Sequence, residues 1–332
     1  MRKTHALNEE IPQKTCKFAY KFLPLHSQKR YLDVWVYPHP KILNNKRNKE
    51  RVLIKNVEGF FYNLKKTDNM EKKPFIQELL KFAYFPTYRQ SIEFLALNLA
   101  DPEDWDFSDS RKKTYSILGN YLEHTFRKIK AEGKIAYSPK NDFASFNTGL
   151  VTKNLEQIYA LFEQNRMPGA GKAPYFFKAF CKESDLQFLR AFPNNHPGIA
   201  DYFQNPEDLI FNPSCKLIPQ IDHIIGDNLC RFPTSLQALG EAEIRLRLMG
   251  AIDEVKKRVR TNYKLAVPQY YGNRIQLLLP LNLTPGSPNP DLALAVYKLQ
   301  SDTYTARTCL TLKMAYNNAR LIVKPQSSWL KP

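Results

Sequence analysis

The chain has 332 residues, of which 43% are hydrophobic and 13% aromatic, so it can bury a substantial core as one large domain or two. Charged residues make up 24% of the sequence, and nothing in this composition indicates wholesale disorder. The net charge of +17 favours nucleic acid or a nucleotide as partner, ahead of an anionic membrane surface; a merely solubilising charge is the alternative.

The sequence lacks the marks of secreted, membrane-spanning and metal-binding proteins. Its five cysteines are scattered without CxxC spacing, which predicts neither a zinc site nor a disulfide framework and favours a reducing compartment. No apolar segment of a secretory signal follows the basic N-terminus, and no apolar run approaches the ~18 residues needed to span a bilayer. We therefore expect a cytoplasmic protein without a membrane span, and secretion by a signal-less route stays open.

Common cofactor and catalytic motifs are also missing. The segment Pro168–Lys172 resembles a phosphate loop, but Arg166 and Ala173 stand where a Walker A motif needs glycine and Ser or Thr. The motifs GxGxxG, HExxH and GxSxG and the kinase signatures are absent. The cofactor and the oligomeric state therefore stay unknown, and no metal ligand set is predicted.

The first 73 residues carry 17 Lys and Arg against 7 Asp and Glu, a net charge of +10. Strand-like runs at Tyr31–Tyr37, Arg51–Lys55 and Phe60–Lys65 predict a small β-rich extension. A linker-like segment before Pro74 divides the chain into residues 1–73 and 74–332. The basic residues expected to contact nucleic acid are Lys41, Lys46, Arg47, Lys49, Arg51 and Lys55.

Helices are predicted first in the larger region, and strands follow. Residues 75–100 have helical character with a break at Pro86, and an amphipathic helix is expected over 111–132, ended by Gly133. From Lys134 the hydrophobic period changes to two, which predicts a meander of strands. These strands are expected at 134–138, 142–147, 156–164 and 175–180.

The rest of the chain is expected to form loops, one long helix and further strands. Residues 184–233 contain many prolines and are expected to form loops, and a long helix is predicted from Thr234 to Asn262. Four further strands are expected at 265–270, 274–281, 291–299 and 305–314. The predicted fold is α+β, with a mostly antiparallel β-sheet core covered by two long helices.

Two polar clusters are candidates for phosphate or nucleotide binding. In FNTGL, residues Asn147, Thr148 and Gly149 would let backbone amides approach an anion, and an ordinary turn, in which Asn and Gly favour positive φ, is the alternative. In HIIGDNLCRFP, His223 is the candidate general acid or base, and Asn228 and Arg231 would hold a phosphate. The alternative for this second cluster is a structural histidine, with Arg231 paired to Asp227.

A third cluster lies in the last sixty or so residues. Tyr270 or Tyr271 would stack on a base, but adjacent strand residues point to opposite faces, so only one of them can face a given ligand. Polar side chains that could read base edges or hold phosphates are Gln276, Asn317, Asn318 and Arg320. Packing of the tyrosines on the sheet and capping by the asparagines is the alternative.

Seven segments, in this order, together resemble an uncharacterised bacterial family built on a domain of unknown function. The segments are ADPEDW (100–105), NYLEHTF (120–126), FNTGL (146–150), IYALF (158–162), HIIGDNLCRFP (223–233), NYKLAVPQYY (262–271) and LTLKMAYNNARL (310–321). Members of the family often occur beside RNA-associated modules such as cold-shock or OST-HTH/LOTUS domains. The resemblance, roughly from Phe75 to Leu330, implies an RNA-related context and assigns no catalytic residue.

Three functions are compatible with these features. We favour an RNA- or nucleotide-processing enzyme, because polar clusters in distant segments suggest one converging pocket. A non-catalytic RNA-binding module and a protein-interaction domain with a basic surface are the alternatives. The first hypothesis predicts that Asn147, His223, Arg231 and Arg320 line a common cavity.

Overall fold

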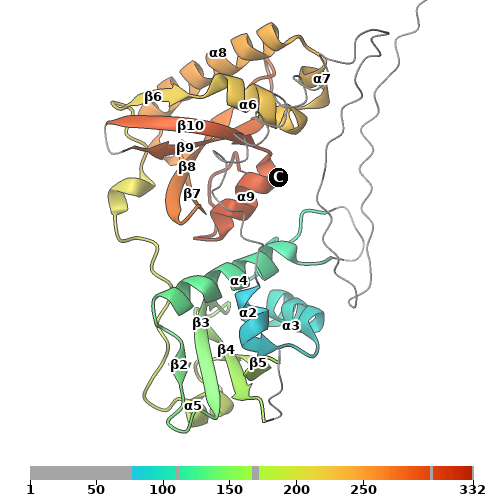
Figure 1. The fold of residues 1–332 in the computed structure, drawn as a ribbon, viewed down its shortest axis with the longest axis vertical. Coiled ribbons are helices and arrows are strands. Elements are labelled where there is room, and N and C mark those ends of the chain that lie inside the picture. The colour runs from blue at the N-terminus through green and yellow to red at the C-terminus, as the bar shows by residue number, and fades with distance from the viewer. Residues whose placement is uncertain (1–76, 109–112, 167–171, 300–301, 331–332) are drawn as a thin grey trace, which may run out of the picture. The chain divides into compact units, whose positions relative to one another are not determined.

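The computed structural model describes residues 77–108, 113–166, 172–299 and 302–330 (Figure 1). The chain divides between Lys72 and Lys73 into two units, and all described residues belong to the second. The strands and basic residues predicted before residue 74 lie outside the described part.

The first sheet is an antiparallel meander with one parallel edge strand. Its order is β1-β5-β4-β3-β2, and only the β1–β5 pairing is parallel. Its strands are β1 (Ala83–Tyr84), β2 (Ala136–Tyr137), β3 (Phe143–Val151), β4 (Gln157–Gln164) and β5 (Tyr175–Lys182). The meander predicted from the period-two pattern is therefore confirmed for β2 to β5.

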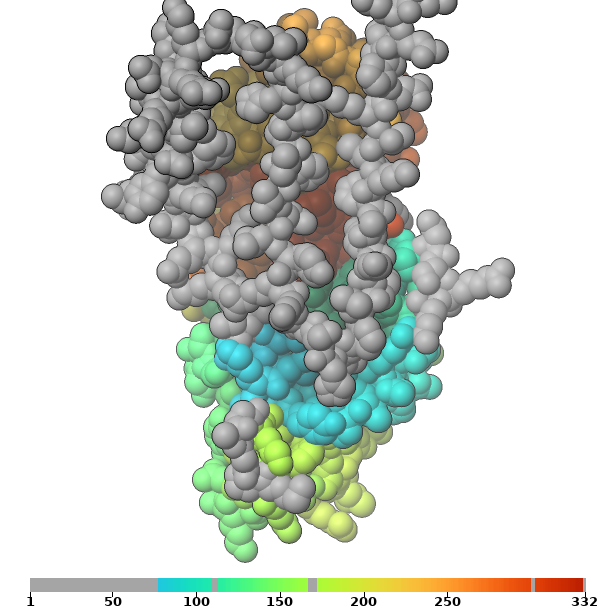
Figure 2. Space-filling model, turned by 45° about the vertical axis from the view of Figure 1, so that its right-hand side comes forward, coloured from blue at the N-terminus to red at the C-terminus, as the bar shows by residue number. Residues whose placement is uncertain are grey.

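Helices cover both faces of this sheet (Figure 1). The helices of this half are α2 (Glu78–Phe82), α3 (Tyr88–Phe94), the π-helix η1 (Leu95–Leu99), α4 (Ser116–Ala131) and α5 (Leu186–Ala191). Helix α4, which lies within the amphipathic helix predicted over 111–132, buries Leu118, Leu122 and Ile129. The segment of α2 and α3, blue to cyan in Figure 2, reaches the surface, where Phe94 is half exposed.

The second sheet has the same plan as the first. Its order is β6-β10-β9-β8-β7, and only the β6–β10 pairing is parallel. Its strands are β6 (Lys216–Pro219), β7 (Val267–Tyr271), β8 (Arg274–Leu281), β9 (Leu292–Lys298) and β10 (Thr303–Leu310). The α+β class is confirmed, and the strands form two sheets, each with one long helix.

Helices α6 to α8 lie on one side of the second sheet and α9 lies on the other (Figure 1). The helical segments of this half are η2 (Pro206–Leu209), α6 (Ile221–Asn228), η3 (Leu229–Arg231), α7 (Thr234–Gln237), α8 (Glu241–Thr261), η4 (Tyr263–Leu265) and α9 (Leu312–Arg320). One hydrophobic cluster joins α4 and the first sheet to α9 and the second sheet, with members such as Phe126, Leu278 and Ala315.

Three boundaries differ from the sequence-based expectation. The predicted loop over 184–233 contains α5, β6 and α6, because short apolar segments between the prolines pack against the sheets. The single helix expected from Thr234 to Asn262 is two helices, and Gly240 begins the second in an extended conformation. The last strand ends at Leu310, one residue before α9 is capped. The Thr311 hydroxyl accepts a hydrogen bond from the Met314 amide and so caps this helix.

Candidate functional site

A β-bulge in β10 presents Arg307 to solvent. The pairing with β9 passes from Ala306 opposite Val296 to Thr308 opposite Ala295, so Arg307 is the extra residue. A bulge leaves its extra residue outside the regular ladder and redirects its side chain. Arg307 is exposed, whereas Ala306 before it is fully buried.

His223 of α6 lies between Arg307 and Asp227. Its Nδ1 is 2.7 Å from Asp227 Oδ2, one helical turn away, and its Nε2 accepts a hydrogen bond of 3.2 Å from Arg307 Nε. An imidazole that accepts a hydrogen bond at Nε2 carries its proton on Nδ1, the atom that here faces the Asp227 carboxylate. The His223 side chain is 33% exposed, so the cluster is open to solvent.

Asn228 and Arg231 form hydrogen bonds with β10 beside the bulge. Thr308 Oγ1 donates to Asn228 Oδ1 over 2.8 Å, and Arg231 Nη1 donates to Thr308 Oγ1 at 2.7 Å and to the Cys309 carbonyl at 2.8 Å. Burial, opposed by the charge of Arg231, raises the pKa of the Cys309 thiol to about 12. Arg231 thus has internal partners, and Asp227 pairs with His223 instead of with Arg231.

The segment FNTGL is a bulge inside β3 and not a turn between strands. The pairing of β3 with β4 shifts between Asn147 and Val151, and Gly149 has φ +72°. The Asn147 amide is 1% exposed and donates to Gln157 Oε1 over 2.6 Å, while the Thr148 hydroxyl donates to the Ile158 carbonyl over 2.6 Å. The Asn147 and Thr148 side chains therefore bond within the protein.

Arg320 lies in a buried network with the same segment. Its Nε donates to Glu103 Oε1 over 2.5 Å, and its guanidinium is 4.4 Å from the Trp105 ring centroid and 4.5 Å from that of Tyr121. The Tyr121 hydroxyl donates to the Thr148 carbonyl over 2.8 Å. Tyr121 thus contacts both the Arg320 guanidinium and the FNTGL segment in the protein interior.

The neighbouring amides form a chain of hydrogen bonds. Asn318 Nδ2 donates to Gln269 Oε1, and Gln269 Nε2 donates to Gln276 Oε1, each over 3.1 Å. The Asn317 Oδ1 atom is buried and has no hydrogen-bond partner within the described part of the chain. Of these hydrogen-bonded amide side chains, Gln276 alone lines a described pocket, which has a volume of about 130 Å³.

The two tyrosines have different surroundings. The Tyr270 ring packs against His124 and Tyr202, at centroid distances of 5.0 and 5.3 Å, and Tyr271 is exposed. The pKa of His124 is lowered to about 4, chiefly because the ring is buried and also because Arg127 and Lys128 lie near it. Tyr271 is thus the more accessible of the pair.

The structure brings His223, Asn228 and Arg231 together, but among the described residues their hydrogen bonds do not reach Asn147 or Arg320. None of the four described pockets is lined by His223, Asn147, Arg231 or Arg320. Sequence reasoning also missed Arg307, although a charged residue inside the predicted strand TARTCL is a signal for it.

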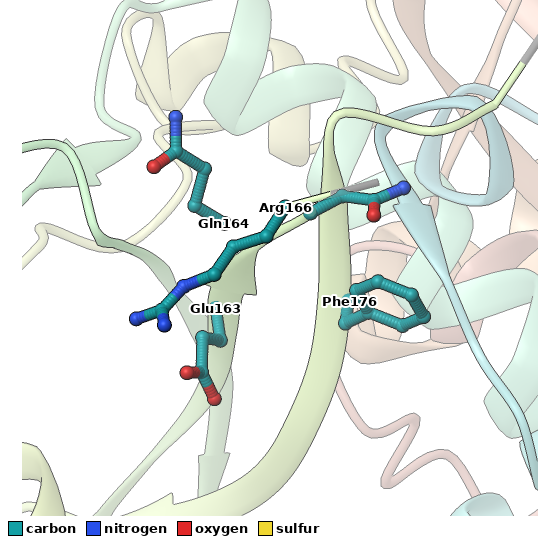
Figure 3. Close-up of a pocket in the computed structure, with 5 residues that line it drawn as sticks. Glu163, Gln164, Arg166 and Phe176 are labelled. Atoms are coloured by element: carbon teal, nitrogen blue, oxygen red, sulfur yellow. The ribbon is translucent and has the colours of Figure 1, made fainter. Parts of the chain in front are cut away.

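Two of the described pockets are on the first sheet. One, of about 310 Å³, has Glu163 and Arg166 on one side and Phe176 on the other (Figure 3). The other, of about 450 Å³, opens beside α5. Among the described residues, no group of three or more His, Cys, Asp and Glu side chains is placed to hold a metal ion.

Residues 97–329 match the family described as Domain of unknown function (DUF3825). This match covers more than half of the chain, so the protein belongs to that family. Neither a curated protein nor a solved structure matches the chain. In the part of the chain that the structure describes, no helix has the length and apolar character needed to cross a membrane.

Proposed function

We propose that the protein processes RNA or a nucleotide at a phosphate ester, with His223 as the group that transfers the proton. One observation supports this proposal above the others: an imidazole held between a carboxylate and an exposed arginine. A histidine oriented in this way by Asp227 can act as general base and then as general acid. The RNA-related context implied by the family resemblance, and the net charge of +17, agree with a polyanionic substrate.

Arg307 would couple substrate binding to activation of His223. Its guanidinium donates a hydrogen bond to the lone pair of His223 Nε2. A general base needs this lone pair to accept a proton. A phosphate group would take over this guanidinium through charge-assisted hydrogen bonds. Nε2 would then be free to accept the proton of the attacking hydroxyl as its oxygen bonds to phosphorus. The bond from phosphorus to the leaving oxygen would break, and Nε2 would return the proton to that oxygen.

The start of α6 adds a weaker attraction for an anion at the same place. The Gln220 amide donates to the Ala306 carbonyl over 2.8 Å, so the N-terminus of α6 lies next to the bulge. A helix N-terminus carries a partial positive charge that favours anions. The cytoplasm, where RNA is available, is the compartment in which we expect this activity.

The second candidate function is RNA binding without catalysis, and one observation favours it. His223 and Arg307 are on an open surface and not in one of the described pockets, as in a protein that recognises a backbone. Under this alternative Arg307 would still contact phosphate, but His223 would only position it. A protein-interaction domain remains the third hypothesis, and RNA affinity that is independent of salt would favour it.

His223→Gln separates the first two functions. For an enzyme we expect RNA turnover to fall at least ~100-fold while RNA affinity, measured in the same buffer, stays nearly unchanged. His196→Gln is the matched control, because His196 has a similar exposure of 32% and also pairs with a carboxylate, that of Glu183. Equal loss of affinity and turnover, or no turnover by the unmodified protein across RNA and nucleotide substrates, would refute the catalytic role.

A further inference from the structure

A pocket of about 450 Å³ on the first sheet, here called the Phe143 pocket, has the residues of a ligand site. Its volume is in the range of about 300–1,000 Å³ that is usual for small-molecule sites. Helix α5 packs on this face of the sheet through Phe188 and Ala191, and the pocket opens beside its last turn. The lining residues that carry the argument are Lys140, Asp142, Phe143, Leu161, Lys178 and Arg190.

The charge of the lining favours an anion. Three cations, Lys140, Lys178 and Arg190, face the pocket with one carboxylate, Asp142. Lys178 pairs with Glu163 over 2.8 Å, outside the lining. Lys140 and Arg190 are exposed and take part in no ion pair within the described residues. Two cations are thus available to a phosphate group.

Part of the pocket lining is apolar and includes an aromatic ring. Leu161 and Ala191 are buried, whereas Phe143 is partly exposed and has Lys178 Nζ 5.4 Å from its ring centroid. The backbone of Phe143 is fixed, because its amide donates to Ser138 Oγ over 3.0 Å and its carbonyl accepts the Ser138 amide over 2.9 Å. An aromatic ring beside cations suits a ligand that is planar and apolar at one end and anionic at the other.

We propose that the Phe143 pocket binds a nucleoside phosphate, with the base on the Phe143 side and the phosphate toward Lys140 and Arg190. Asp142 and Gln187 supply a carboxylate and an amide that can bond to ribose hydroxyls or to base edges. The ligand is either a free nucleotide or one nucleotide of an RNA strand. The inference goes beyond the proposed function, because this pocket is in the first sheet and His223 packs against the second.

Calorimetric titration of the full chain with AMP, adenosine, inorganic phosphate and a short single-stranded RNA tests the proposal. We expect saturable binding of AMP that is tighter than that of adenosine. Arg190→Gln should weaken it ~tenfold, as loss of a charge-assisted contact does. Phe143→Leu should weaken AMP binding and leave phosphate binding unchanged. His223→Gln should bind AMP as the unmodified protein does, so failure of the proposed catalysis and failure of this site are distinguishable.

The matched control is Lys153→Gln. Lys153 is exposed in the connection between β3 and β4, is absent from the pocket lining, and takes part in no ion pair within the described part of the chain. A second outcome is that the unmodified protein fails to bind AMP and still binds RNA. If Arg190→Gln then weakens RNA binding, the result supports the site and identifies an RNA strand as the source of the nucleotide. No saturable binding of AMP or RNA, or equal weakening by Lys153→Gln and Arg190→Gln, would overturn the proposal.

Discussion

Arg320 and Glu103 are 217 positions apart in the chain and form a buried ion pair, with side chains only 6% and 4% exposed. The guanidinium lies close to the rings of Trp105 and Tyr121, and the Tyr316 hydroxyl donates to the same carboxylate oxygen over 3.3 Å. These residues come from three of the segments on which the family resemblance depends. The pair therefore joins the start of the matched region to its last helix.

Removing one partner of this pair should destabilise the fold strongly. We expect Arg320→Met or Glu103→Gln to lower the free energy of unfolding by about 3–5 kcal/mol, because the remaining charged or polar group stays buried without its partner. The measurement is denaturant unfolding, with Lys324→Gln as control, since Lys324 and Asp101 form an exposed pair at 3.7 Å. The double variant should recover part of the loss, and a single variant no worse than the control would contradict this role.

Gly149 is predicted to tolerate no side chain while Tyr121 keeps its hydroxyl. A Cβ atom at Gly149 would lie 2.6 Å from the Tyr121 oxygen, and the backbone there has φ +72°. We expect Gly149→Ala to cost about 1–3 kcal/mol of stability or more. Tyr121→Phe removes the oxygen, so the double variant should lose less than the sum of the single losses.

The control for this second prediction is Gly250→Ala. Gly250 lies inside α8 and a Cβ atom there meets nothing within 4 Å, so the substitution should be neutral or stabilise by up to about 1 kcal/mol. Strictly additive effects of Gly149→Ala and Tyr121→Phe would show that the contact with Tyr121 is not the cause.

His124 should make the protein sensitive to mild acid. Its pKa is about 4 in the folded state and 6.5 in the absence of burial, so the unfolded chain takes up a proton that the folded protein excludes. The contribution of His124 is fully present above pH 6.5 and is lost as the pH falls toward 4, by roughly 3 kcal/mol in all. His124→Phe should flatten the pH dependence of the unfolding free energy in this window, and identical slopes for the two proteins would exclude His124 as its source.

Regular elements with a long hydrophobic pattern were predictable from sequence. The buried residues Leu248, Ile252, Val255 and Val259 of α8 have the helical spacing that predicts such an element, and Gly133, the predicted stop, follows the end of α4 with φ +66°. The period of two in LTLKM suggested a strand through Met314, but the Thr311 cap starts a helix there. The Thr311 cap marks the change from strand to helix, which the hydrophobic pattern does not distinguish.

The candidate site was predictable only in part. His223, Asn228 and Arg231 are close in sequence and stay close in the fold, and Asp227 reaches His223 because α6 places them one turn apart. Arg307 reaches His223 from 84 positions away, and only because β10 pairs beside α6 and is bulged at that residue. Such contacts depend on tertiary packing, which short motifs do not encode.

Each sheet is completed by a parallel edge strand that is remote in sequence, as Thr305 of β10 and Ile218 of β6, 87 positions apart, illustrate. During synthesis β6 leaves the ribosome well before β10 exists, and β1 likewise precedes β5. Until the later strand arrives, the backbone groups of the earlier one have no partner and can pair with another nascent chain. Formation of the two long-range parallel pairings, β1 with β5 and β6 with β10, should therefore limit the yield of newly made protein more than formation of either meander does.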